Sequence, residues 1–218
     1  MAAPNFTGDV QQTTFEDLIC SLDLTPGLHN KLTFVSVLNS VLSVTAFLGN
    51  APILSALHKE SSLHPPSKLL LRNLATTDLC VGLIAEPLTV IFWTSQVNQQ
   101  WNICRYAVMV QFITNYILFG VSVETLTAMS VERLFALLLR LRYRQAVTIK
   151  RTYVIVITFW IVCTVISTIR FWNRFLALWC DIKVTFLCLV ISTFSYTKIF
   201  FTLSHHQDQV QDHVQQPN

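Results

Sequence analysis

The chain has 218 residues, of which 52% are hydrophobic and only 12% are charged, and its mean hydropathy is +0.50. Soluble proteins carry about 25% charged residues, so this chain has too few polar groups to cover a globular surface. Its long apolar runs exclude a soluble enzyme, a disordered chain and a disulfide-stapled miniprotein. The net charge of +3 says little about nucleic acid, and we expect no nucleic-acid partner.

Five apolar runs predict membrane-spanning helices, because about 20 helical residues cross a hydrocarbon core of about 30 Å. The predicted spans are residues 32–57, 69–95, 104–139, 153–172 and 176–203. Such continuous runs exclude the alternating strands of a membrane barrel. The sequence therefore predicts an all-α transmembrane helix bundle over residues 31–203, after an N-terminal tail at residues 1–30. Residues 204–218 are expected to continue the fifth helix as a polar segment that frays before Pro217.

The distribution of basic residues predicts the orientation, because cytoplasmic loops are rich in Lys and Arg. The tail before Lys31 has acidic residues but no Lys or Arg. The connections after the first and third runs are basic, with Lys59, Lys68 and Arg72, and with Arg133, Arg140, Arg142, Arg144, Lys150 and Arg151. We therefore expect a multi-pass plasma-membrane protein with its N-terminus outside and its C-terminus in the cytoplasm. The sequon Asn5-Phe6-Thr7 then predicts outer-face glycosylation at Asn5.

Ionisable residues inside a span are costly, which makes each of them a functional candidate. Asp78 lies near mid-depth in the second run, where the Asn50 amide of the first run can hydrogen-bond to it. Glu124 lies in the middle of the third run and is expected to face the fourth and fifth. Asp181 and Lys183 lie two residues apart on the fifth run, so each needs a partner elsewhere or must reach outward.

Short motifs along the runs share an order and a membrane depth. They are Gly49-Asn50, Asn73-Leu74-Ala75 with Asp78, Cys104, Glu132-Arg133, Trp160 and Tyr196. Together they resemble the motifs of rhodopsin-like (class A) G-protein-coupled receptors, over about residues 31–203. The resemblance implies five helices of a seven-helix receptor fold, truncated after the fifth. It also implies an extracellular ligand, a heterotrimeric G protein if helices six and seven complete the fold, and membrane lipid as partners, and it allows a receptor dimer.

The resemblance implies a G-protein switch at the inner end of the third helix. Arg133 corresponds to an arginine that moves between a neighbouring acid and the G protein, and Glu132 supplies that acid. The coupling region would also include Leu141, Tyr143 and Tyr196. The plainer alternatives are that Arg133 is a positive-inside anchor and that the basic cluster around Leu141 faces anionic lipid.

The resemblance also implies a cation site and a ligand pocket. Asp78 and Ser122 correspond to a sodium site, because a hard cation prefers oxygen ligands, and Asn50 and Trp160 take structural roles beside it. The alternative is a neutral Asp78 or one bonded to Asn50; sodium is the single cofactor considered. The pocket candidates are Glu86, Asn115, Tyr116 and Phe119. Asn115 stands where amine receptors carry Asp, which disfavours an aminergic ligand, and Glu86 can instead be a solvated interfacial carboxylate.

A disulfide between the start of the third helix and the second outer loop is also implied by the resemblance. Cys104 takes the first position, but the short loop at about residues 170–174 has no cysteine. Cys180 is the nearest candidate partner, so the expectation is a Cys104–Cys180 bridge, with Cys20 also on the oxidising side.

These observations favour a receptor, or a fragment of one, that signals through Glu132 and Arg133. The alternative is a truncated, non-signalling membrane partner that retains full-length receptors. A transporter or channel fragment would show pseudo-symmetric halves and broken midplane helices, and neither is apparent. No Gly-rich phosphate loop or metal-spaced Cys/His set indicates an enzyme. A coding sequence that continued past Asn218 into two further apolar spans would favour the receptor.

Overall fold

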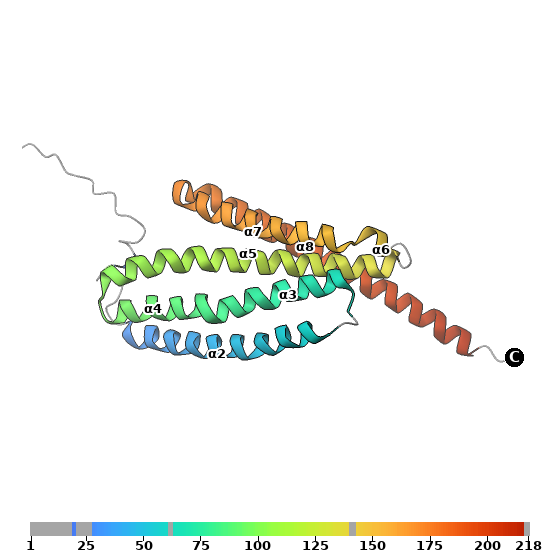
Figure 1. Ribbon diagram of the computed structural model, residues 1–218, viewed down its shortest axis with the longest axis horizontal. Helices are drawn as coiled ribbons and strands as arrows, with labels where there is room; N and C mark the ends of the chain where they lie inside the picture. Colours follow the sequence, from blue (N-terminus) through green and yellow to red (C-terminus); the bar gives the residue numbers. More distant parts are fainter. Residues whose placement is uncertain (1–18, 21–27, 61–62, 140–142, 216–218) are drawn as a thin grey trace, which may run out of the picture.

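The computed structural model describes residues 19–20, 28–60, 63–139 and 143–215, and the elements within these ranges are helices (Figure 1). In chain order they are α2 (His29–Lys59), α3 (Pro65–Cys80), the π-helical turn η2 (Val81–Ala85), α4 (Glu86–Val97), α5 (Trp101–Leu139), α6 (Tyr143–Ala146), α7 (Ile149–Trp172) and α8 (Arg174–Gln215). Because α3, η2 and α4 follow one another without a break, they form a single span.

Five helical segments of the described chain are long and apolar enough to cross a membrane. They are His29–Lys59, Pro65–Val97, Trp101–Leu139, Ile149–Arg170 and Arg174–Ser204. Large apolar side chains such as Phe34, Val154 and Phe186 point away from the bundle and are 64–68% exposed, as expected where lipid replaces water. The predicted all-α transmembrane bundle is therefore confirmed. The helix of the fifth span runs on to Gln215, beyond the apolar run.

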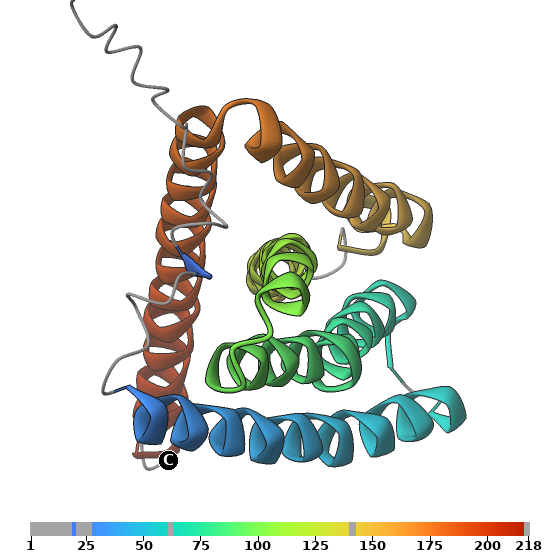
Figure 2. The same cartoon turned by 90° about the vertical axis from the view of Figure 1, so that its left-hand side faces the viewer.

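Helix α5 lies at the centre of the arrangement. Viewed along its axis, it is surrounded by the α3–α4 span, α7 and α8, and it contacts each of them (Figure 2). Helix α2 lies outside this group and packs against α3, η2 and α4. Side chains that α5 presents to different neighbours can therefore carry separate sites on one helix.

The second span loosens into a π-helical turn just before Pro87. Proline has no N–H and its ring crowds the carbonyl four residues earlier, so a regular helix cannot pass through it unchanged. Here Val81–Ala85 take up the mismatch, and the Glu86 N–H bonds to the Val81 carbonyl. The turn brings Gly82 against α2, where the Ser43 hydroxyl donates to the Gly82 carbonyl at 2.6 Å. The π-helical turn that accommodates Pro87 thus allows a close contact between the second span and α2.

Gly82→Ala is expected to lower the free energy of unfolding by about 1–3 kcal/mol, the usual cost of overpacking a tight contact. A Cβ at Gly82 would lie 2.9 Å from the Ser43 carbonyl oxygen and 3.0 Å from the Phe47 nitrogen, and backbone atoms cannot swing aside. Gly49→Ala on α2 is the matched control, because nothing lies within 4 Å of its added Cβ. Thermal unfolding in lipid nanodiscs should show loss of stability for Gly82→Ala only. Equal midpoints would contradict this contact.

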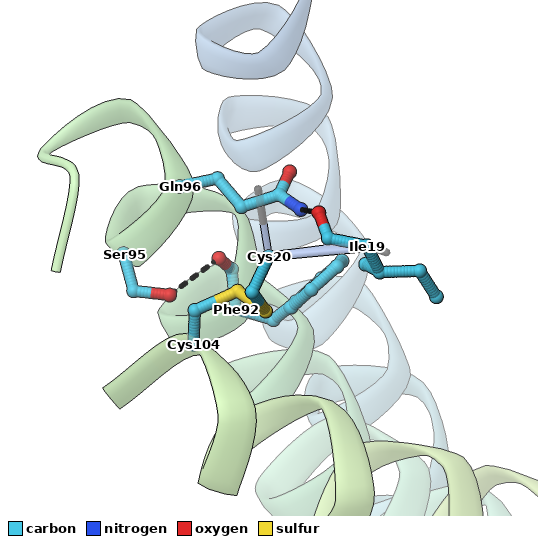
Figure 3. Close-up of a disulfide and its surroundings, with 6 residues drawn as sticks. All are labelled: Ile19, Cys20, Phe92, Ser95, Gln96 and Cys104. Atoms are coloured by element: carbon cyan, nitrogen blue, oxygen red, sulfur yellow. Dashed lines mark hydrogen bonds between the residues drawn. A yellow bond between two sulfur atoms is a disulfide. The ribbon is translucent and has the colours of Figure 1, made fainter. Parts of the chain in front are cut away.

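The disulfide joins Cys104 to Cys20, with Cα atoms 6.1 Å apart (Figure 3). Cys180 on α8 is a free thiol. The expected Cys104–Cys180 bridge is therefore wrong. Ile19 and Cys20 lie beside the end of α4, where Gln96 Nε2 donates to the Ile19 carbonyl at 3.0 Å. The bridge is buried among Phe92, Ala107 and Val108, so tail and helix ends share one apolar cluster.

Candidate functional site

Three helices are joined near the middle of the bundle by one asparagine. Asn73 on α3 accepts a hydrogen bond from the Trp160 indole of α7 at 3.0 Å and donates to the Thr125 hydroxyl of α5 at 2.8 Å. Thr125 is fully buried and donates to the Val121 carbonyl of its own helix. Each polar group in this hydrogen-bond network has a partner. The network, called the interlock below, therefore fixes the relative positions of α3, α5 and α7. The structural role expected for Trp160 has a geometric basis here.

Glu132 is buried near the end of α5 and is held from two directions. Ser67 of α3 donates to its Oε1 at 2.6 Å, and the Tyr143 hydroxyl of α6 donates to the same oxygen. His64 Nδ1 lies 3.3 Å from that hydroxyl. Burial, and then the hydrogen bond to Glu132, raise the pKa of Tyr143 to about 12, so the phenol keeps its proton at neutral pH. The carboxylate thus ties α6 to the bundle.

Arg133, next in sequence, is exposed and forms no ion pair with Glu132 in the described part of the chain. The expected local pairing of these two charges is therefore not present, because successive residues on a helix point in different directions. Tyr196 is 50% exposed on α8 and is not hydrogen-bonded to either residue in the described structure, and Leu141 lies outside the described residues. The structure brings together Glu132 and Tyr143 from the predicted switch, and leaves Arg133 accessible to a partner.

Asp78 and Asn50 are not hydrogen-bonded to each other in the described structure. The Asn50 amide instead donates to the Ala46 carbonyl of its own helix at 2.9 Å, so the expected bond between helices is not formed. Ser122 donates to Thr77 at 3.0 Å, one residue before Asp78. The Asp78 carboxylate and the Ser122 hydroxyl therefore come from facing helices, and the sodium site stays a prediction. No group of three or more His, Cys, Asp or Glu in the described ranges is placed to hold a metal.

The half of the bundle near the disulfide contains several buried polar atoms without a partner among the described residues. They are Glu86 Oε2 and Trp93 Nε1 on α4, Gln111 Oε1 on α5, and Arg170 Nε on α7. The Gln111 amide donates to Thr89 at 3.3 Å, which sets the register of α4 against α5. Glu86 lies one turn before Thr89 on α4, and Asn115 lies one turn after Gln111 on α5, so this register places Glu86 level with Asn115. Phe119 is 57% exposed, so of the four pocket candidates it is the least enclosed.

Arg170 connects the last turn of α7 to two other helices. Its guanidinium forms an ion pair with Asp181 of α8 and lies over the Tyr116 ring of α5, with Cζ 3.3 Å from the ring centroid. Sequence reasoning asked for a partner of Asp181 without naming this one. The sequence signal that could have identified this pair is the presence of opposite charges on either side of the short turn at Asn173. The contact means that Tyr116 is already covered by a cation.

Comparison with known proteins decides the family. The model of the "7 transmembrane receptor (rhodopsin family)" matches residues 49–174, more than half of the chain. The chain belongs to the rhodopsin family of seven-transmembrane receptors. This rhodopsin-family chain is accordingly a multi-pass membrane protein, and the resemblance carried by its motifs is confirmed.

Individual rhodopsin-family receptors match at moderate identity. The human olfactory receptor OR51C1 is 36% identical over 142 residues, which are 63% of this chain and 43% of that receptor. The bovine muscarinic acetylcholine receptor M3 is 26% identical over 147 residues, 66% of this chain and 24% of that receptor. The dog 5-hydroxytryptamine receptor 1D is 24% identical over 133 residues, 61% of this chain and 34% of that receptor. The chain thus spans less than half the length of these relatives.

Proposed function

We propose that this rhodopsin-family chain acts as a receptor for an extracellular ligand and couples to a heterotrimeric G protein at the end of α5 that carries Arg133. The observation that carries the proposal is the arrangement at that end. Glu132 is occupied by Ser67 and Tyr143, while the neighbouring guanidinium is exposed. A cation that is held in place by a rigid helix, but is not committed to a local acid, is available to a partner protein.

The orientation that this function needs is supported by the disulfide. Disulfides persist in oxidising surroundings, so the Cys20–Cys104 bridge supports the proposal that this end of the bundle lies outside the cell. The opposite end, with Arg133, Lys150 and Arg151, then faces the cytoplasm, as the basic residues predict. Plasma-membrane location follows from this proposal. Glycosylation at Asn5 belongs to it as well, but Asn5 lies outside the described residues.

The ligand is proposed to bind in the outer half, between α4 and α5. Unpartnered Glu86 and Gln111 oxygens there are acceptors that a ligand with hydrogen-bond donors would satisfy. Asn115 lies on the same face of α5, and its amide can both donate and accept. Asp78 and Ser122 offer one carboxylate and one hydroxyl, which is part of the oxygen set that a sodium ion takes.

Arg133→Ala tests the coupling. In membranes from cells that express the whole coding sequence of the gene, ligand-independent GTPγS binding to added G protein should fall by about tenfold or more, because one charge-assisted contact is worth about 1.5–3 kcal/mol. Arg151→Ala is the matched control: it removes a positive charge from the same end, but that guanidinium donates to the Ala146 carbonyl. Unchanged exchange in Arg133→Ala, or an equal loss in Arg151→Ala, would favour a simple positive-inside anchor and overturn the assignment.

A further inference from the structure

A cavity of about 440 Å³ lies between α5, α7 and α8, away from the outer ligand region. Its walls are mostly apolar, and Phe135, Ile155 and Leu187 on its edge are 41–58% exposed. These side chains belong to membrane-crossing helices, so the cavity opens toward lipid and is reached from within the bilayer. Its volume is within the range of about 300–1,000 Å³ that small-molecule sites occupy.

Glu124 lines this cavity with a carboxyl oxygen that has no partner among the described residues. Its side chain is only 8% exposed, it lines the cavity, and its Oε2 has no hydrogen-bond partner in the described structure. The Cys163 thiol of α7 hydrogen-bonds to this carboxyl, and Oε2 is the oxygen that stays without a partner. Sequence reasoning placed Glu124 on the face toward the fourth and fifth spans, and α7 and α8 are those spans. A buried acceptor without a donor is a position that a ligand can satisfy.

The remaining charged groups of the cavity are already engaged. Glu132 lines the inner end and accepts from Ser67 and Tyr143, while Arg151 donates to the Ala146 carbonyl. The walls thus carry two carboxyls and one guanidinium, and Glu124 has the free oxygen. Charge complementarity therefore favours a cationic donor and disfavours a fatty acid, whose carboxylate would approach Glu124.

We propose that this cavity binds a lipophilic amine that enters from the bilayer, with its ammonium group donating to Glu124 Oε2. The apolar walls take the hydrocarbon body, and Glu124 supplies the counter-charge. The site is distinct from the proposed ligand region, because none of Glu86, Asn115 and Tyr116 lines it. It needs no G protein, so its test is independent of the proposed receptor function.

Photolabelling of the full chain in lipid nanodiscs tests this proposal. The probe is dodecylamine with a diazirine in its chain, and the comparison probe is the matching dodecanol. Covalent label is scored by mass spectrometry on four residues of α8 that line the cavity, which are Val184, Leu187, Cys188 and Ile191. The amine-to-alcohol labelling ratio should fall about tenfold in Glu124→Gln, since one charge-assisted hydrogen bond is lost.

Two further variants test whether labelling depends on the Glu124 carboxyl, on the open volume of the cavity, or on a general change in the fold. Ala128→Leu keeps Glu124 but fills the cavity, and it should reduce labelling by both probes. Asp181→Asn removes another carboxyl, on α8, that does not line the cavity and pairs with Arg170, and its ratio should equal that of the original chain. An unchanged ratio in Glu124→Gln, or equal falls in Glu124→Gln and Asp181→Asn, would overturn the proposal. A wild-type preference for the alcohol would assign the cavity to a neutral lipid instead.

Discussion

Cys20→Ser is expected to lower the free energy of unfolding by about 2–5 kcal/mol, the usual range for removal of a native disulfide. The bridge closes a loop between residues 84 apart, so its loss frees the tail in the unfolded state. In the folded state the tail also leaves the cluster formed with Phe92, Ala107 and Val108. Thermal unfolding in nanodiscs and surface staining of the receptor would both report the loss.

Cys180→Ser is the matched control for this prediction. It makes the same chemical change on the free thiol that sequence reasoning had chosen as the partner of Cys104. It should leave the unfolding midpoint close to that of the original chain, and Cys104→Ser should match Cys20→Ser. A non-reducing digest should contain one peptide that links Cys20 to Cys104. A linked Cys104–Cys180 peptide, with a large loss in Cys180→Ser, would contradict the structure.

Asn73→Ala is the second large effect that we expect, at about 2–4 kcal/mol of lost stability. The substitution leaves the Trp160 indole N–H without its acceptor and removes the donor to Thr125. A buried polar group left unpaired costs about 1–3 kcal/mol, and here one residue serves two helices. The measurement is the unfolding midpoint of the chain in nanodiscs.

Asn39→Ala provides the control, because its amide donates to the Val35 carbonyl of its own helix and joins no other element. It should cost much less than Asn73→Ala. A double-mutant cycle between Asn73→Ala and Trp160→Phe should show coupling of about 0.5–3 kcal/mol, as for residues in direct contact. Additive effects would mean that the interlock between α3 and α7 does not contribute to stability.

The helices could be predicted from sequence because lipid requires each span to satisfy its own backbone. The ends of the helices were harder to predict from the sequence. The second span was expected from residue 69 but begins at Pro65, since proline suits the first turn of a helix. The fourth was expected from residue 153 but begins at Ile149, because Lys150 and Arg151 extend the helix beyond the apolar run. Hydropathy marks the part of a helix in lipid and not its polar turns.

The site was predicted in part, for a related reason. Local motifs identified Glu132, Arg133 and Trp160, but not which of them touch. The contacts of Asn73 with Trp160 and of Glu132 with Ser67 join residues 87 and 65 apart in sequence, and they depend on how the helices pack. The partner of Cys104 depended on where Cys20 lies, and the sequence around Cys20 carries no periodic pattern that predicts its position. Helical spacing tells which residues of α5 share a face with Glu124, whereas the packing of α7 and α8 determines what that face meets.

The central claim is that α5 carries Arg133 to the cytoplasmic end of a membrane-crossing bundle whose N-terminal tail is outside. Epitope tags placed after Met1 and between Arg144 and Gln145 test it most directly, by antibody staining of cells before and after permeabilisation. The account predicts that the first tag stains in intact cells and the second only after permeabilisation. Staining of the second tag in intact cells would contradict it.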